Sequence, residues 1–96
     1  MIRTIKDSAT QDIFDGLNSK AARKLPQELH RKARRQLDLL NAVTRVEDLR
    51  VPPGNQLEAL KGDLKGFHSI RINDQWRIIF RWKDAGAEDV KIVDYH

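Results

Sequence analysis

The sequence predicts an α+β fold in which N-terminal helices pack on a small, largely antiparallel sheet of about four to five strands. Residues 76–82 alternate strictly, so one face of a strand carries four large apolar side chains: Trp76, Ile78, Phe80 and Trp82. Residues 26–42 instead have apolar side chains every three or four positions, which is typical of an amphipathic helix. Since helical patterns come first and strand patterns follow, we expect the helix to cover the tryptophan face.

The N-terminal segment predicts a short strand followed by a short helix. Met1–Ile5 is rich in β-branched residues and is expected to join the same sheet at its edge. Asp7 or Ser8 can cap a helix that runs to about Asp15, and Gly16 is expected to end it.

The main helix is expected from about Pro26 to Ala42, because proline is favoured in a first helical turn. Residues 18–25 before it predict a loop or a further helical turn, and residues 46–49 another short helical turn. Its apolar stripe is formed by Leu29, Ala33, Leu37 and Leu40. Its other faces carry His30, Arg31, Lys32, Arg34, Arg35 and Gln36.

The C-terminal half predicts a meander after a break at residues 51–55. The expected strands cover residues 56–60, 67–72, 76–82 and 88–94. In the turn between the last two strands, Gly86 is expected to supply a positive φ.

Composition predicts one domain over residues 1–96 and a cytoplasmic location. The chain has no cysteine, no signal-peptide pattern and no segment near the roughly 20 apolar residues of a membrane span. The net charge is +4, and residues 20–50 contain nine Lys or Arg against four Asp or Glu. Such a basic half is typical of a protein that binds nucleic acid or an acidic protein partner, or it is simply a solvated helix face.

Two groups of residues could carry chemistry. Arg77 and Arg81 share a strand face around Ile79, where they could bind a polyanion or pair with acids on a neighbouring strand. Asp94-Tyr95-His96 bring an acid, a phenol and an imidazole to the end of the last strand; the alternative is a frayed terminus without a role.

Other polar residues give weaker signals. Lys61 precedes a glycine turn, and Glu58 could face the same side as the arginines. Ser69 has no evident nucleophile context, and His30 and His68 are typical surface or boundary residues. No metal-ligand spacing and no phosphate-binding glycine loop occurs, so we expect no metal or cofactor; an enzyme of this kind would use acid/base chemistry and charge stabilisation.

From about Asp48 to the C-terminus the chain resembles the HigB family of bacterial toxins, plasmid-maintenance killer proteins of the RelE/ParE superfamily. The resemblance is carried by Leu57–Asp63, Gly66–Arg71, Asn73–Phe80 and the ending Asp94-Tyr95-His96. The run Arg50–Leu60 is similar to one subgroup with the pattern R-x-P-P-G-N-x-L-E-x-L.

This resemblance implies the RelE-like microbial RNase fold and a ribosome-dependent endoribonuclease. Such toxins enter the ribosomal A site and cut mRNA, leaving a 2′,3′-cyclic phosphate and a 5′-OH. They are held inactive by an antitoxin, typically with a helix-turn-helix domain, and the pair binds its own operator DNA through the antitoxin.

The resemblance also implies residue roles. The implied catalytic set is Glu58, Lys61, Arg77, Asp94, Tyr95 and His96. Arg77 and Lys61 would hold the phosphate, and Tyr95 would orient or stack on a base. Some family members have histidine at the position of Glu58, so the base and acid stay open, with Glu58 as base and His96 as acid preferred. Arginines expected to contact RNA are Arg71, Arg81, Arg31, Arg34 and Arg35.

Two alternatives remain at the level of sequence. One is a ParE-like toxin that inhibits gyrase without a nuclease site; the presence of Arg77 and the C-terminal trio argues against it. The other is a binding module whose basic helix docks RNA or an acidic partner.

Overall fold

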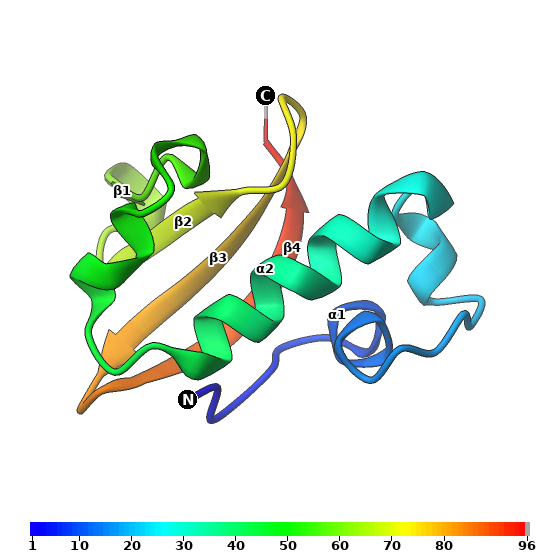
Figure 1. Ribbon diagram of the computed structural model, residues 1–96, viewed down its shortest axis with the longest axis horizontal. Helices are drawn as coiled ribbons and strands as arrows, with labels where there is room; N and C mark the ends of the chain where they lie inside the picture. The colour runs from blue at the N-terminus through cyan, green and yellow to red at the C-terminus, as the bar shows by residue number, and fades with distance from the viewer. Residues whose placement is uncertain (96) are drawn as a thin grey trace.

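The computed structural model describes residues 1–95 and consists of two helices packed on a four-stranded antiparallel sheet, with the longer helix across one face and the shorter one beside the edge strand β4 (Figure 1). The strands are ordered β1-β2-β3-β4, so each pairs with its neighbour in sequence. The helices are α1 (Ser8–Phe14) and α2 (His30–Ala42), and the strands are β1 (Glu58–Ala59), β2 (Phe67–Arg71), β3 (Trp76–Lys83) and β4 (Gly86–Asp94). Short 3-10 turns cover Ala22–Lys24, Gln27–Leu29, Val46–Arg50, Pro53–Asn55 and Gly62–Leu64. The predicted α+β class is confirmed. No helix among residues 1–95 is long and apolar enough to cross a membrane.

The first helix begins and ends where the sequence predicts. The Asp7 side chain accepts a hydrogen bond from the Thr10 backbone N–H at 3.0 Å, which satisfies one of the free donors at the helix N-terminus. Gly16 follows the C-terminus with a φ of 76°, a conformation in which a glycine costs least.

Helix α2 covers the sheet as predicted but begins later than Pro26. Pro26 itself is extended, and the Leu29 N–H bonds back to the Pro26 carbonyl at 2.9 Å in a 3-10 turn, so the regular helix starts at His30. Ala33, Leu37 and Leu40 are completely buried against the sheet.

The sequence placed the polar residue Gln36 outside the apolar stripe of α2, and the structure shows otherwise. It is buried, and its amide donates to the Asn55 side-chain carbonyl and to the Arg71 backbone carbonyl, both at 2.9 Å. These bonds compensate its burial and tie α2 to the loop before β1 and to β2.

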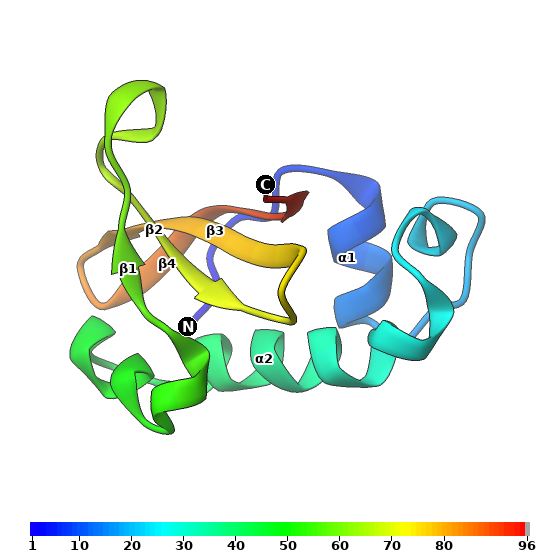
Figure 2. The ribbon, with the colours of Figure 1, turned by 90° about the horizontal axis from the view of Figure 1, so that it is seen from above.

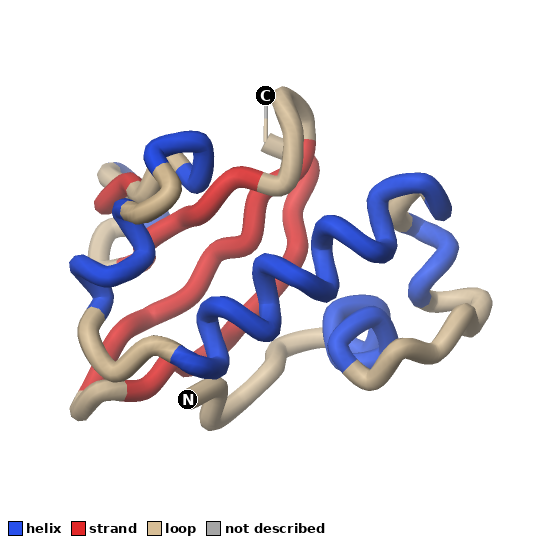
Figure 3. The backbone as a smooth tube through the Cα atoms, in the orientation of Figure 1, coloured by secondary structure: helices blue, strands red, loops and turns tan. Residues whose placement is uncertain are grey.

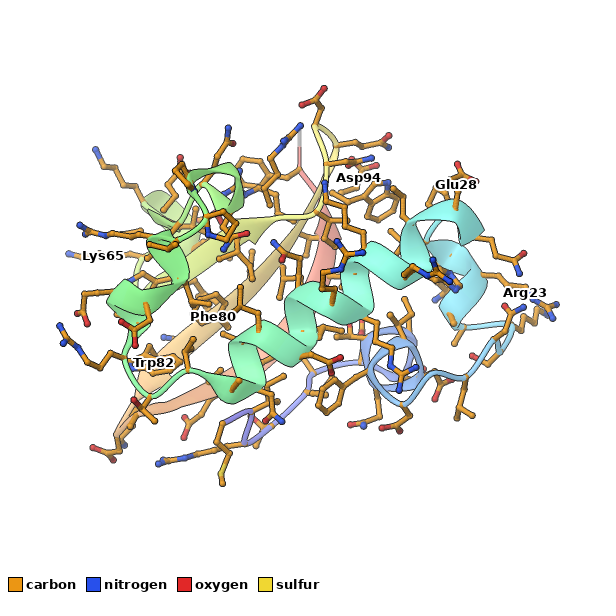
Figure 4. All side chains as sticks on the ribbon, viewed as in Figure 1. Arg23, Glu28, Lys65, Phe80, Trp82 and Asp94 are labelled. Carbon is orange, nitrogen blue, oxygen red and sulfur yellow. The ribbon has the colours of Figure 1, made fainter. Side chains whose placement is uncertain are left out.

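The core between sheet and helices confirms the alternation of β3. Ile78 and Phe80 are fully buried, Trp76 and Trp82 are half-buried on the same side, and Ile79 points to the opposite face. In Figure 4, Phe80 and Trp82 lie beside the C-terminal end of α2, toward the green segment that follows the helix.

Two predicted strands are shorter or less regular than expected. Strand β1 contains only Glu58–Ala59 instead of residues 56–60, because Gln56 has a left-handed backbone with a φ of 48°. Residues 1–6 form no strand and are drawn as loop in Figure 3, but Ile2 and Ile5 make isolated parallel bridges to Ala87 and Val90 of β4. The expected place of this segment beside the sheet is therefore correct.

The prediction for the β3–β4 turn was wrong in its key residue. Asp84 and Ala85 supply the positive φ values, 51° and 62°, that a two-residue hairpin turn of this hand requires. Gly86 is instead the first residue of β4, and a Cβ there would lie 2.5 Å from Nε of Arg3. The glycine is needed for the close approach of Arg3.

His68 gives the fold a pH dependence. Its ring stacks on Phe80 with 5.8 Å between centroids, its Nδ1 receives no hydrogen bond from the described residues, and burial lowers the pKa of His68. The unfolded chain therefore binds the His68 proton more readily than the folded chain.

We expect the free energy of unfolding that neutral His68 contributes to be fully present above the unfolded pKa of about 6.5. This contribution should be lost as the pH falls below that value. Urea denaturation at about pH 7.5 and about pH 5.5 measures the difference, and His68→Gln should reduce it. An unchanged difference in His68→Gln would exclude His68 as its source.

Candidate active site

The sheet face opposite α2 carries the candidate site. No helix among the described residues covers this face, and the loop of residues 60–66 rises beside it on the side away from α2 (Figure 2). A small apolar cluster of Leu60, Phe67 and Ile79, supported by Leu64 and Val93, forms its floor. This apolar floor packs against the loop of residues 60–66, and the rest of the face is open to a ligand.

Arg77 is a buried cation on this face. Its side chain is only 8% exposed, and its guanidinium donates to Ser69 Oγ at 2.9 Å through Nε and to the Gln56 carbonyl at 2.5 Å through Nη2. The described residues supply no acceptor for Nη1 and no carboxylate partner. A positive charge held at a fixed place without a counter-ion is suited to binding an anion.

Tyr95 and Glu58 complete a cluster around Arg77. The Arg77 Cζ lies 5.6 Å from the centre of the Tyr95 ring, within range of a cation–π contact. The Tyr95 hydroxyl lies at the 3.5 Å limit of a hydrogen bond to Glu58 Oε1, and the Tyr95 N–H donates to the Gln75 carbonyl at 2.6 Å. Three of the sequence-predicted catalytic residues are thus brought together although they come from β1, β3 and the end of the chain.

The other predicted catalytic residues lie nearby or outside the described part. Asp94, at the end of β4, accepts a hydrogen bond from the Gln75 amide at 3.1 Å. Lys61 is exposed and lies two residues after the end of β1. His96 lies outside the described residues. Among residues 1–95 no group of three His, Cys, Asp or Glu side chains is arranged to hold a metal ion.

Arg81 lines a neighbouring hollow on the same sheet face, and two contacts hold its side chain in place. Its guanidinium stacks over Phe67, 4.3 Å from the ring centre, and Nε pairs with Asp89 Oδ2 on β4 at 3.5 Å. The pairing with an acid on an adjacent strand agrees with the simpler of the two expectations for Arg81. The hollow has a volume of about 520 Å³, and Lys6, Lys91 and Tyr95 also line it.

Of the remaining predicted RNA-contacting arginines, three lie away from the open sheet face and one, Arg71, lies beside Arg77. Arg31, Arg34 and Arg35 line a hollow of about 570 Å³ between α1 and α2, on the helical layer rather than on the open sheet face. Arg71 pairs with Asp74 and, together with Arg35, lines a third hollow of about 390 Å³ beside α2. Arg71 is also the cross-strand partner of Arg77 in the β2–β3 pair, so the structure brings Arg71 beside Arg77 but leaves Arg31, Arg34 and Arg35 on the helical layer.

Three residues that position the site were not predicted from the sequence: Ser69, Gln75 and Gln56. Ser69 is diagonal to Arg77 across the β2–β3 pair, in which Ser69 faces Ile79 and Arg71 faces Arg77. The shared face of Ser69 and Arg71 was a usable signal, since diagonal side chains on paired strands contact one another. Gln75, which binds both Asp94 and Tyr95, and the Gln56 carbonyl had no comparable signal.

Comparisons with known proteins show relatives over most of the chain. A family model described as "RelE-like toxin of type II toxin-antitoxin system HigB" matches residues 5–96. Toxin HigB-1 of Vibrio cholerae is 39% identical over 87 residues, which cover 91% of this chain and 90% of that protein. An uncharacterized protein of Haemophilus influenzae is 38% identical over 61 residues, covering 64% of this chain and 60% of that protein.

Solved structures share the fold at low sequence identity. A YoeB dimer from Staphylococcus aureus superposes with a TM-score of 0.62 at 20% identity, covering 100% of this chain and 97% of that one. A YafQ mutant from E. coli gives 0.63 at 16% identity, with 96% and 92% coverage. A heterotetrameric YoeB–YefM toxin–antitoxin complex from Staphylococcus aureus gives 0.55 at 19% identity, with 100% and 98% coverage.

Proposed function

Since this chain belongs to the RelE-like HigB toxins of type II toxin–antitoxin systems, we propose that it is an endoribonuclease that cleaves messenger RNA on the translating ribosome. The observation that carries the proposal is the buried guanidinium of Arg77, which has no carboxylate partner among residues 1–95, beneath the Tyr95 ring, with Glu58 at the Tyr95 hydroxyl. This combination offers an anion site, a stacking surface and a carboxylate on one open face.

The proposed reaction is attack of the RNA 2′-oxygen on the adjacent phosphorus. The new O2′–P bond and the broken P–O5′ bond leave a 2′,3′-cyclic phosphate and a 5′-OH. Glu58 accepts the 2′-OH proton, and His96 donates a proton to the leaving 5′-oxygen. Arg77 and Lys61 stabilise the negative charge that accumulates on the pentacoordinate phosphate. Tyr95 stacks on a base or orients the substrate, and Asp94 orients the end of the chain.

The Glu58 position fits a base that works beside cations. Its register partner across β1 and β2 is Ser69, the residue that holds Arg77 Nε. The carboxylate is therefore placed on the same part of the sheet as the guanidinium. This proposal uses no metal ion and no cofactor.

The proposal extends to the partners. The toxin acts in the cytoplasm and is neutralised by a cognate helix-turn-helix antitoxin of the HigA type, and it reaches operator DNA only through that antitoxin. The YoeB–YefM structure is a toxin–antitoxin complex of a protein with the same fold.

A map of mRNA 5′ ends after induction in translating cells tests the proposed activity. We expect new 5′-OH ends inside open reading frames, in phase with codons, and no such ends in Arg77→Ala. Growth arrest with supercoiling defects and without new ends would instead indicate gyrase inhibition. A third result, in which charge reversal of Arg31, Arg34 and Arg35 removes the new ends while Arg77→Ala does not, would move the activity to the helical layer.

A further inference from the structure

We infer that Asn55 and Gln36 are positioning residues for Arg77, and that they act through the backbone carbonyl of Gln56. The inference rests on the proposed function, because it matters for catalysis only if Arg77 binds the reacting phosphate. Neither residue touches the open sheet face; each would act through a chain of buried hydrogen bonds.

The first step is the carbonyl that holds the guanidinium. Gln56 O accepts from Arg77 Nη2 at 2.5 Å, while Ser69 Oγ accepts from Nε at 2.9 Å on the other side. With two nitrogens fixed, the direction of Nη1 is set by where these two acceptors stand. A displacement of the Gln56 carbonyl therefore rotates the charge that the phosphate would meet.

The second step is the backbone that carries this carbonyl. Gln56 has φ 48° and ψ 53°, in the left-handed region that side-chain-bearing residues adopt only when their surroundings hold them there. The Gln56 N–H donates to the Pro53 carbonyl and the Asn55 N–H to the Pro52 carbonyl, both at 3.0 Å. These local bonds shape the turn but do not attach it to the rest of the molecule.

The third step is the attachment, which Asn55 supplies. Its side chain is 3% exposed; the amide nitrogen donates to the carbonyls of Leu49 and Val51 at 3.2 Å each. Its side-chain oxygen accepts from Gln36 at 2.9 Å, and Gln36 also donates to the Arg71 carbonyl at 2.9 Å. One buried amide pair therefore fixes the turn to α2 and, through Arg71, to the strand that carries Ser69.

The positions of both Arg77 acceptors therefore depend on the same two elements, strand β2 and helix α2. Ser69 stands on β2, and Gln36 bonds both to the β2 backbone at Arg71 and to the turn that carries the Gln56 carbonyl. Loss of the amide pair frees one acceptor but leaves the other in place. This would mis-aim the guanidinium without removing it.

The test compares Asn55→Ala with Leu40→Ala, a core substitution in α2 that removes no hydrogen bond, after denaturation has shown both to be folded under assay conditions. Misplacement of a catalytic group by about 1 Å can cost about 100-fold in rate, so we expect Asn55→Ala to lower kcat by roughly 10- to 100-fold with little change in KM. Leu40→Ala should keep kcat within about threefold of wild type. If Asn55→Ala fails to fold, Gln36→Met takes its place in the test, because it removes the donor of the same Gln36–Asn55 hydrogen bond and keeps a similar side-chain volume.

A second readout does not depend on cleavage. Rotation of the Arg77 guanidinium about its Nε–Cζ bond, followed by nitrogen-15 NMR, should become faster in Asn55→Ala and stay unchanged in Leu40→Ala. An unchanged rotation rate, or an equal loss of kcat in both variants, would overturn the inference. If wild-type toxin does not cleave mRNA, the proposed function fails, and the rotation rate still decides whether Asn55 positions Arg77.

Discussion

Replacing Arg77 by alanine is expected to abolish the new mRNA 5′ ends and to lower ribosome-dependent cleavage by about 100- to 1,000-fold. The guanidinium is buried and held by two neutral acceptors, so it presents a fixed positive charge that an exposed, mobile side chain does not reproduce. Single-turnover cleavage of programmed ribosomes by purified protein measures the loss.

The same substitution also affects stability, and the two effects have to be separated. Ser69 Oγ and the Gln56 carbonyl both lose their donor, which costs about 1–3 kcal/mol for each acceptor that stays buried and unpaired. Cleavage is therefore compared at a temperature where circular dichroism shows both proteins folded.

Arg81→Ala is the matched control, because Arg81 lies four residues along the same strand and remains half exposed. It should lower cleavage by less than about tenfold, since an exposed and ion-paired arginine contributes little beyond general phosphate contact. Equal losses in Arg77→Ala and Arg81→Ala would show that only the overall charge of the face matters. Full activity of folded Arg77→Ala would place the nuclease site elsewhere.

Phe80→Ala should produce the largest loss of stability from a single core substitution. The ring is completely buried, stacks on His68 and meets Trp82 edge-on with 6.4 Å between centroids. Truncation of a buried phenylalanine costs about 3–5 kcal/mol, a large share of the roughly 5–15 kcal/mol that stabilise a typical domain. Urea denaturation should show a much lower midpoint with little change in slope.

Leu17→Ala is the control for that measurement. Leu17 is also a large apolar residue but is 54% exposed, so its truncation should change the free energy of unfolding by no more than about 0.5 kcal/mol. A loss below about 1 kcal/mol for Phe80→Ala would contradict the packing described for the β3–α2 core.

The fold was predictable wherever one periodicity dominated. Residues 76–82 and the stripe of α2 placed the same side chains in the core that the structure buries. The prediction failed where a contact distant in sequence decides the local conformation. Gln36 is polar and lies in a polar run, and only the presence of Asn55 and the Arg71 carbonyl makes its burial favourable. Gly86 looked like a turn residue because its other use, room for Arg3, depends on a segment more than 80 residues away.

The candidate site was predictable in its members but not in its geometry. Glu58, Arg77 and Tyr95 are the residues that the family resemblance implies, and the structure brings them together. Their spacing depends on the strand register and on the turn before β1, which periodicity does not determine. The same limit explains why Arg31, Arg34 and Arg35 were grouped with the site: a linear charge count does not reveal that a helix stands on the other side of the sheet.

The contact between the two ends of the chain has a consequence for synthesis. The N-terminal segment bonds to β4 through the Arg3 N–H to the Ala87 carbonyl and the Lys6 N–H to the Val90 carbonyl, both at 2.8 Å. Because the ribosome makes the chain from its N-terminus, this segment stays unpaired until β4 has been synthesised. Contacts between segments so distant in sequence form late in folding. Tyr95 follows β4 in the chain and reaches the candidate site only after that strand has been made. We therefore expect the growing chain to lack an assembled candidate site until β4 has left the ribosome and paired with the N-terminal segment.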